Sequence, residues 1–218
     1  MVAKSHIPQE IVMHLEDMID LAAGLPEFTI FYNGPECGAS APDHMHFQAA
    51  DKFAMPIDIE YEKIKSLYGK ALKTSPKLNC FAVDDGLRKM FSFESTNKYY
   101  LVQALKVFFT CMPQNGKMYD EPMMNIVANF SNKSWRVIVF PRQKGRSSHF
   151  YAKTEKHIMI SPAAVEFGGI MILPSEKDFL KITKKELQEV FFEVSIEKET
   201  MKEITGKFMK KLRNPESI

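Results

Sequence analysis

The sequence predicts an α+β fold in which helices flank an antiparallel sheet. Two pairs of strand-like segments are each joined by a short polar turn, and such hairpins place neighbouring strands antiparallel. Segments with helical spacing lie before, between and after these hairpins. The 218 residues, of which 45% are hydrophobic and 26% charged, suffice for a sizeable core. We therefore expect a single domain, residues 1–218, built on one sheet.

The first half of the chain is expected to contain one helix and four strands. Residues 8–23 carry apolar side chains at helical spacing and begin at a proline, which is favoured in a first helical turn. Residues 27–32 are aromatic and β-branched, which favours a strand, and residues 44–48 alternate like a second strand beside it. Residues 76–83 and 87–93 flank an Asp-Asp-Gly turn and form the first expected hairpin.

The second half is expected to add a hairpin and several flanking segments. Residues 96–110 have helical spacing, with Ser95 as the expected N-cap. Residues 123–130 and 135–140 form a hairpin around the turn SNKS. Four segments complete the expected fold: strands at 157–160 and 167–173, a helix from about 176, and a last helix over 196–212. We expect the last helix to cover an edge of the sheet.

Charge and cysteine content exclude several classes of function. Lys and Arg number 29 against 27 Asp and Glu, and the net charge of +2 creates no general attraction to nucleic acid or an anionic membrane. The N-terminus lacks the apolar segment of a signal peptide, and the most apolar stretch is interrupted by a glutamine and a lysine. The three cysteines show no zinc-site spacing. We expect a cytoplasmic protein with reduced thiols and with neither a membrane nor a nucleic-acid partner.

A His-x-His-x-Gln segment carries the chemistry that the sequence predicts. Residues two apart in a strand point to one side, so His44, His46 and Gln48 would share a face. A neutral imidazole can attack phosphorus when a carbonyl holds the proton on its other nitrogen. We predict His46 as the nucleophile, with His44 and Gln48 donating to phosphoryl oxygens or to the leaving group. Taken alone, a His-x-His pair is more often a solvated surface feature or a weak metal site.

Two loops are predicted to contact phosphate. Gly38 and Ala39 present little side chain and Ser40 adds a hydroxyl, so a ligand can approach the backbone amides of this loop. Arg142 and Arg146 lie in a basic loop after the second hairpin, and arginine suits bidentate phosphate contacts. We predict both as contacts to substrate or incoming phosphate; the alternative is a solvated loop without a ligand.

Several stretches resemble one enzyme superfamily. FYNGPECGASAPDHMHFQA resembles the active-site segment of the histidine-triad (HIT-like) superfamily, in its galactose-1-phosphate uridylyltransferase branch, where His-x-His-x-Gln replaces three histidines. HMHFQAADKFAMPIDIEYEK is similar to the GDP-hexose phosphorylases, which use phosphate to cleave GDP-sugars to GDP and a hexose 1-phosphate. MMNIVANFSNKSWRVIVFPRQ resembles the C-terminal part of diadenosine tetraphosphate phosphorylases. The resemblance implies a HIT-like domain.

The resemblance also assigns roles to residues. It implies that His46 takes up the nucleoside monophosphate beside His44 and Gln48, that the Gly-Ala-Ser loop lines the phosphate pocket, and that Asn33 faces the ligand. Related chains have strands before the histidine segment, and SHIPQE looks like the tail of such a part, so we expect a shortened or N-terminally truncated domain. Its exposed sheet edge favours a homodimer. The cysteine pair that helps the uridylyltransferases bind a structural metal is missing here, so no metal is expected.

These features together predict a nucleotidyltransferase or nucleotide-sugar phosphorylase of GDP-hexose or dinucleoside polyphosphate type. It would act through a nucleotidyl-His46 intermediate, take phosphate or a sugar phosphate as acceptor, and need no cofactor. The alternative is a non-catalytic nucleotide-binding protein that has lost part of its substrate site. A third reading, a metal-dependent hydrolase using His44 and His46, requires a carboxylate or a further histidine nearby.

Overall fold

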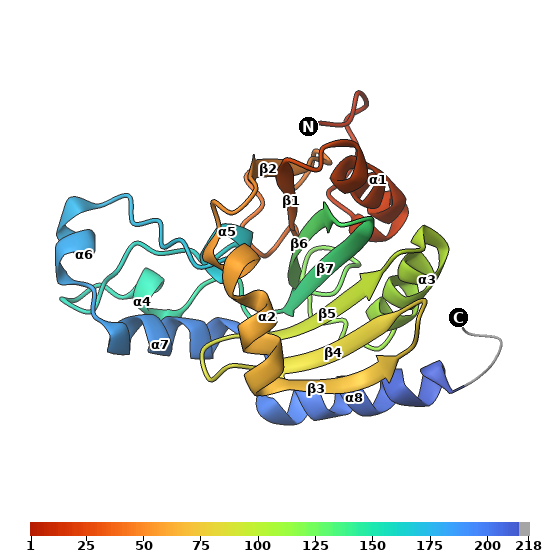
Figure 1. The fold of residues 1–218 in the computed structure, drawn as a ribbon. Coiled ribbons are helices and arrows are strands. Elements are labelled where there is room, and N and C mark those ends of the chain that lie inside the picture. The colour runs from red at the N-terminus through yellow and green to blue at the C-terminus, as the bar shows by residue number, and fades with distance from the viewer. Residues whose placement is uncertain (214–218) are drawn as a thin grey trace.

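The structure, a computed structural model, describes residues 1–213 and is built on one seven-stranded antiparallel sheet (Figure 1). Every strand pair is antiparallel, which confirms the predicted α+β class. The strands lie in the order β2 (Gln48–Asp51), β1 (Phe28–Asn33), β6 (Met124–Ser131), β7 (Ser134–Pro141), β5 (Lys89–Ser95), β4 (Asn79–Asp84) and β3 (Gly69–Thr74). Within the described residues, β2 and β3 are thus the two edge strands.

Helices cover both faces of this sheet. One face carries α1 (Ile11–Gly24), α3 (Lys98–Phe109) and α8 (Lys198–Leu212). Their buried side chains form the larger core with the sheet, and Phe108 at its centre meets Phe91, Phe93 and Phe208 with ring centroids 4.7 to 5.4 Å apart. As predicted, α8 packs on the edge strand β3.

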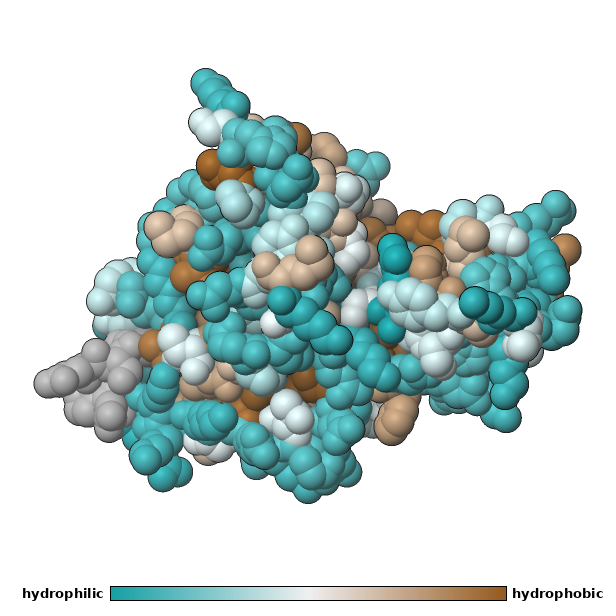
Figure 2. Space-filling view, turned by 180° about the vertical axis from the view of Figure 1, so that it is seen from behind, coloured by the Kyte–Doolittle hydropathy of each residue, from teal (hydrophilic) through white to brown (hydrophobic). Residues whose placement is uncertain are grey.

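The opposite face carries a second core and leads to an extension of the molecule. There α2 (Pro56–Tyr68), α5 (Ala164–Phe167) and the end of α7 (Lys184–Val194) bury apolar side chains against the sheet. The rest of α7, with α4 (Ser148–Tyr151) and α6 (Glu176–Lys181), forms an arm that projects past the sheet, at the left of Figure 1. Seen from behind, the surface is mostly hydrophilic, and apolar residues gather in the recess between the main body and the arm (Figure 2).

Both predicted hairpins are confirmed, and their turns explain their sequences. β4 and β5 flank a turn in which Gly86 has a φ of +85° and the side chain of Asp85 accepts hydrogen bonds from the amides of Leu87 and Arg88. β6 and β7 flank Asn132 and Lys133, which both have positive φ. That conformation suits a two-residue hairpin because its twist matches that of the strands.

Other predictions are corrected by the structure. The N-cap of α3 is Asn97, whose side chain accepts from the amide of Tyr100, whereas Ser95 ends β5. The expected strand at 157–160 is absent; Ile158 and Ile160 alternate with exposed neighbours but pack against α7, with no strand beside them. The strand expected over residues 167–173 is also absent: Phe167 ends α5, and residues 168–173 follow it as a loop. The helix α2 and the strand β3 were not predicted from the sequence.

The helices of residues 1–213 are all too short or too polar to cross a membrane. Within this range the three cysteines are buried and unpaired with one another. This agrees with the reduced thiols expected from the sequence.

Candidate active site around His46

His46 lies just before β2, where the edge of the sheet separates from β1. Pairing of these strands ends with Phe31 opposite Gln48, so Asn33 and His46 would lie opposite each other two positions further along the ladder. The buried side chain of Gln9 lies between them instead. Its Nε2 donates to the carbonyls of Asn33 and His46 at 3.1 Å each, and its Oε1 accepts from the His46 amide at 2.8 Å. The strand expected over residues 44–48 therefore begins only at Gln48.

The ring of His46 is held in one tautomer. Its Nδ1 lies 2.9 Å from the backbone oxygen of His44. A carbonyl oxygen can only accept, so the neutral ring carries its proton on Nδ1 and keeps the lone pair on Nε2. No group in residues 1–213 forms a hydrogen bond with Nε2, and the side chain is only partly buried. This is the arrangement required of a nucleophilic imidazole.

The ring of His44 is turned away from His46. Its Nε2 lies 3.0 Å from the carbonyl of Ala3, so this nitrogen donates to the N-terminal segment. The ring also lies against that of His6, with centroids 4.8 Å apart. This differs from the predicted donation by the His44 ring to a leaving group. It is the backbone carbonyl of His44, rather than its ring, that meets His46.

Gln48 and Asn33 belong to one chain of side-chain amides. Asn33 donates from Nδ2 to Oε1 of Gln48 at 3.1 Å, and its Oδ1 accepts from Asn125 and from the Ala164 amide at 2.8 Å each. Asn33 is therefore buried, and both polar atoms of its side chain are bonded within the protein, which differs from the predicted position facing a ligand. Gln48 is exposed, and because its oxygen is taken by Asn33, its two N–H groups remain available.

The loop with the small residues is tied to the sheet on one side. Asn125 donates to the carbonyl of Cys37 at 2.7 Å, directly before Gly38. Gly38 has a φ of +93°, and a Cβ there would lie 2.7 Å from that of Ala163. Glycine is thus required at this position both by backbone conformation and by close packing. Burial raises the pKa of the Cys37 thiol to about 12, so this cysteine does not compete as a nucleophile.

A cavity of about 610 Å³ joins this loop to the basic loop after β7. Gly38 and Ala39 line one side, and Lys117, Lys144 and Arg146 bring positive charge from other segments. The structure thus brings together three of the residues that were predicted to contact phosphate. Ser40, although exposed, and His46 are not among the residues that line the cavity.

His46 contributes instead to a smaller cavity of about 170 Å³ near the N-terminal segment and α1. A drug-sized ligand usually occupies 300 Å³ or more, so this cavity alone is too small for a nucleotide. The predicted site residues are therefore divided between the two places. The amide chain through Asn33, Asn125 and Cys37 connects them.

The two arginines of the basic loop lie in opposite environments. Arg146 is exposed, donates from Nε to the Ser161 hydroxyl at 3.0 Å, and stacks on Phe150 with 4.1 Å to the ring centroid. Arg142 is completely buried, and its guanidinium donates to five oxygens. These acceptors are Oδ1 of Asn125 and the carbonyls of Val194, Pro162, Lys144 and Gly145.

This geometry corrects the prediction that Arg142 contacts substrate. A guanidinium has five N–H groups, and all five of those of Arg142 are bonded within the protein. Its burial lowers the pKa of the guanidinium below the usual value. Arg142 therefore has a structural role. Through the carbonyls of Lys144 and Gly145 it holds the loop that carries Arg146, and through the carbonyl of Pro162 it holds the segment before α5.

Glu121 connects α1, which follows Gln9, to the sheet. It is buried, and its two oxygens accept from the amide of Ile11 at 2.5 Å and from the Tyr32 hydroxyl at 2.7 Å. Burial raises the pKa of this carboxyl group to about 7, although both hydrogen bonds act in the opposite direction. The segment containing Gln9 is thus fixed at its C-terminal side by an acid that titrates near neutral pH.

The part of the chain that the structure describes holds no cluster of three or more His, Cys, Asp and Glu side chains at metal-binding distance. The reading as a metal-dependent hydrolase required a third ligand beside His44 and His46. None is found among these residues.

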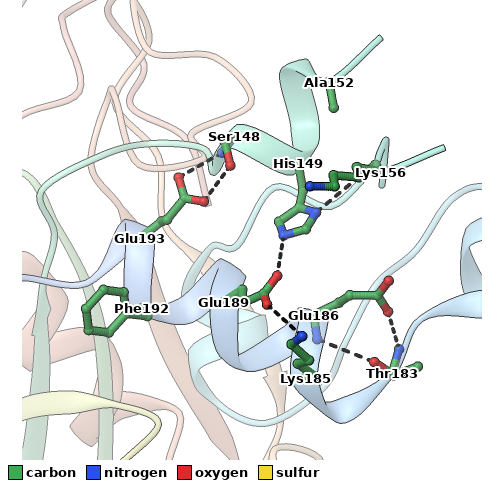
Figure 3. A pocket seen from close by; sticks show the side chains of 10 residues that line it. All are labelled: Ser148, His149, Ala152, Lys156, Thr183, Lys185, Glu186, Glu189, Phe192 and Glu193. Atoms are coloured by element: carbon green, nitrogen blue, oxygen red, sulfur yellow. Dashed lines mark hydrogen bonds and ion pairs between the residues drawn. The ribbon is translucent and has the colours of Figure 1, made fainter. Parts of the chain in front are cut away.

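A further cavity, of about 660 Å³, lies on the arm between α4 and α7 (Figure 3). His149 bridges the two sides, with Nδ1 at 3.1 Å from the Lys156 carbonyl and Nε2 at 3.0 Å from Glu189. The amide and hydroxyl of Ser148 donate to the carboxylate of Glu193. These polar groups satisfy one another and hold α4 against α7. No predicted site residue lines this cavity.

Comparison with known proteins places the chain in a family. Residues 85–214 match the family described as "GDPGP1-like, C-terminal domain", and residues 1–51 match "Domain of unknown function (DUF4922)". The chain belongs to the GDPGP1-like family. This confirms the resemblance to the GDP-hexose phosphorylase group. The His44–Gln48 segment falls within the first of these two matches, DUF4922.

Solved structures also resemble this GDPGP1-like chain. A DUF4931 family protein from Bacillus cereus ATCC 10987 has 15% sequence identity and a TM-score of 0.45, with 87% of this chain and 84% of that chain covered. The yeast Ap4A phosphorylase Apa2, solved in complex with AMP, has 15% identity and a TM-score of 0.43, with 88% of this chain covered. The match spans 64% of the yeast chain. No curated protein matches the chain significantly.

Sequence reasoning missed Gln9 and Asn125, which hold the site of the GDPGP1-like chain together. Gln9 falls inside the predicted first helix, which in the structure begins only at Ile11, and Asn125 falls inside a predicted strand. Gln9 reaches a residue 37 positions away, and Asn125 reaches residues 88 and 92 positions away. Polar residues at otherwise buried positions were the available signal, because such groups need partners that the fold must supply.

Proposed function

We propose that this chain is a nucleotidyltransferase or nucleotide-sugar phosphorylase in which His46 carries the nucleotide. The observation that carries the proposal is the tautomer of His46: Nδ1–H is bound by the His44 carbonyl, and Nε2 has no partner among the described residues. Membership of the GDPGP1-like family supports the reaction class. Gly38 and Ala39 line a cavity for phosphates in which three cations, Lys117, Lys144 and Arg146, outnumber one carboxylate, Glu36, whose Oε1 accepts from the amides of Lys117 and Met118.

The reaction consists of two displacements at one phosphorus atom. The Nε2 lone pair attacks the α-phosphorus of a GDP-hexose or dinucleoside polyphosphate, forming a P–N bond as the bond to the bridging oxygen breaks. The leaving group, a hexose 1-phosphate or a nucleotide, departs with that electron pair. An oxygen of inorganic phosphate then attacks the phosphorus, and the P–N electron pair returns to Nε2. The product from a GDP-hexose is GDP.

Neighbouring groups serve this reaction without changing their protonation. The ring becomes cationic when the P–N bond forms, and the His44 carbonyl bound to Nδ1–H stabilises that charge. The two free N–H groups of Gln48 donate to phosphoryl oxygens. A phosphate leaving group needs no general acid because its second pKa is near 6.

The test is turnover of a panel of GDP-, UDP- and ADP-hexoses and dinucleoside polyphosphates with inorganic phosphate, with products separated by chromatography. One donor class should give the nucleoside diphosphate. His46→Ala should abolish turnover, and the melting temperature should stay within a few degrees because the side chain is only half-buried. Unchanged turnover in His46→Ala would refute the mechanism.

One observation favours the alternative, a nucleotide-binding protein without transfer activity. His46 does not line the cavity that carries Lys117, Lys144 and Arg146, so a nucleotide bound there need not meet it. Binding of GDP that Arg146→Met weakens, with no turnover of any donor in the panel, would favour this alternative.

Partners and assembly are also part of the proposal. We propose that the chain acts as a single cytoplasmic domain and that two copies associate through the outer edge of β2, because β1 is the one strand beside β2 among residues 1–213. Exposed strand edges tend to be covered. Sedimentation analysis showing only monomer at micromolar concentration would remove the homodimer.

A further inference from the structure

Gln9 is the most constrained polar side chain around His46. It is 1% exposed, and its amide makes three hydrogen bonds, all to backbone atoms of other segments. Both N–H groups of Nε2 meet carbonyl oxygens, and Oε1 meets an N–H group. Exchanging the amide nitrogen and oxygen would place an oxygen against two carbonyls, so the orientation is unambiguous.

The side-chain amide of Gln9 takes the place of backbone hydrogen bonds between two strands of the sheet. In an unbroken ladder, the amide and the carbonyl of His46 would bond directly to Asn33. Here both bond to Gln9, whose Nε2 passes the connection on to Asn33. Because a side chain lies between the two backbones, the His46 segment stands further from β1 than β2 does. The site is thus a local opening of the sheet edge, and one glutamine fills it.

The outer side of the same segment is held separately. The amide of Ala3 donates to the carbonyl of Met45 at 2.9 Å, and Val2 forms an isolated bridge with His46. The N-terminal segment therefore holds the residue before His46. The backbone N–H and carbonyl of His46 itself point toward β1 and bond to Gln9. The carbonyl of His44, which sets the tautomer, is two residues away in this segment.

We propose that Gln9 is the positioning residue for His46: by holding the His46 backbone away from β1, its amide aims Nε2 at the α-phosphorus. This inference rests on the proposed function. Gln9 touches neither substrate nor the reacting nitrogen and acts only through the peptide of His46. Loss of the Gln9 amide should slow formation of the nucleotidyl-histidine. It should leave nucleotide affinity little changed, because neither Gln9 nor His46 lines the cavity that contains Arg146. A displacement of about 1 Å can cost about 100-fold in rate.

The experiment measures adduct formation in a single turnover. GDP-glucose, or the donor that is turned over in the panel, is mixed with excess protein without phosphate, and the intact mass is followed with time. Gln9→Met keeps the length of the side chain without its hydrogen bonds. It should slow the rate of adduct formation about 10- to 100-fold, while the Kd for GDP changes less than threefold. Long-range ¹H–¹⁵N spectra should show a single Nδ1–H tautomer of His46 in the wild type and a mixture in Gln9→Met.

Matched variants separate positioning from stability. Thr29→Val removes another buried hydrogen bond from β1, the one that Thr29 donates to Asp58 at 2.8 Å, and should leave the rate unchanged. In Gln9→Glu a carboxylate oxygen can still accept from the His46 amide, and protonation of the carboxylate restores one donor for a backbone carbonyl. The ratio of its rate to that of the wild type should therefore rise as the pH falls. This variant also serves if Gln9→Met fails to fold.

The outcomes distinguish the two proposals. An adduct that forms at the wild-type rate in folded Gln9→Met, together with its absence in His46→Ala, would overturn the role of Gln9 alone. An adduct that persists in His46→Ala would overturn the proposed function. A rate lowered equally by Gln9→Met and Thr29→Val would reduce Gln9 to a general contribution to stability and would also overturn the inference.

Discussion

The segment around His46 and the loop after β7 both drew attention by residue type, but they use their polar groups differently. His46 keeps one ring nitrogen free of residues 1–213, because only Nδ1 is bonded to a group in this range. Arg142 keeps nothing free, because five protein oxygens accept from its guanidinium. The difference teaches that a reactive residue type indicates a site only when part of its bonding capacity remains unused. In the basic loop that condition holds for Arg146.

Removing Arg142 should have the largest effect on stability. Arg142→Met leaves several buried carbonyls without donors, and the free energy of unfolding should fall by about 3 to 5 kcal/mol. Arg146→Met, in the same loop but exposed, should change it by less than about 0.5 kcal/mol. Urea denaturation of both variants makes the comparison. Equal losses would contradict the division between a structural and an available arginine.

The support of the His46 segment should depend on pH through Glu121. Its folded pKa of about 7 lies above the unfolded value, so the folded state binds the proton more tightly. The corresponding stability is complete below about pH 4.5 and is lost as the pH rises through about 7, at up to about 1.4 kcal/mol per pH unit. Glu121→Gln stays neutral, and its carbonyl and amide can still serve Ile11 and Tyr32.

Comparing Glu121→Gln with the wild type isolates the contribution of the Glu121 carboxyl group to stability. Between pH 5 and pH 8 the free energy of unfolding of Glu121→Gln should gain on that of the wild type, by about 3 kcal/mol at most. Denaturation curves at several pH values provide the measurement. A constant difference across this range would show that Glu121 does not titrate as its burial demands.

Loss of Arg146 should have the smallest effect, and on binding alone. Arg146→Met removes one cation from the cavity lined by Gly38 and Ala39. Affinity for GDP should fall about tenfold, or about 1.4 kcal/mol, with an unchanged melting temperature. Calorimetric titration with GDP checks this, and Lys70→Met on the exposed edge strand β3 is a control for net charge. The same loss in both variants would mean that only general charge matters.

Most of the sheet was predictable because alternation and turn residues are local signals. The β4–β5 and β6–β7 hairpins follow from them directly. The same signal failed at Ile158 and Ile160, whose alternating burial arises from packing on α7 without a partner strand. β3 was missed because its residues are largely exposed at the sheet edge and show no apolar alternation.

The candidate site was predictable only in part. The predicted phosphate contacts of Gly38, Ala39 and Arg146 agree with the common cavity that these residues line, whereas the role of His46 stays a prediction. The burial of Arg142 could not be predicted, because it depends on the carbonyls of Pro162 and Val194, which come from two other parts of the chain. Nor could the contact of Gln9 with His46, which joins residues 37 positions apart. Such long-range hydrogen bonds leave no pattern in a single sequence.

The most direct test of the central claim locates the nucleotide on the protein. The chain is incubated without phosphate with the donor that is turned over, digested at neutral pH to preserve the P–N bond, and its peptides are mapped by mass. The account predicts one nucleoside monophosphate on the peptide that contains His46, lost on addition of phosphate and absent from His46→Ala. A nucleotide found on another residue, or retained in His46→Ala, would contradict it.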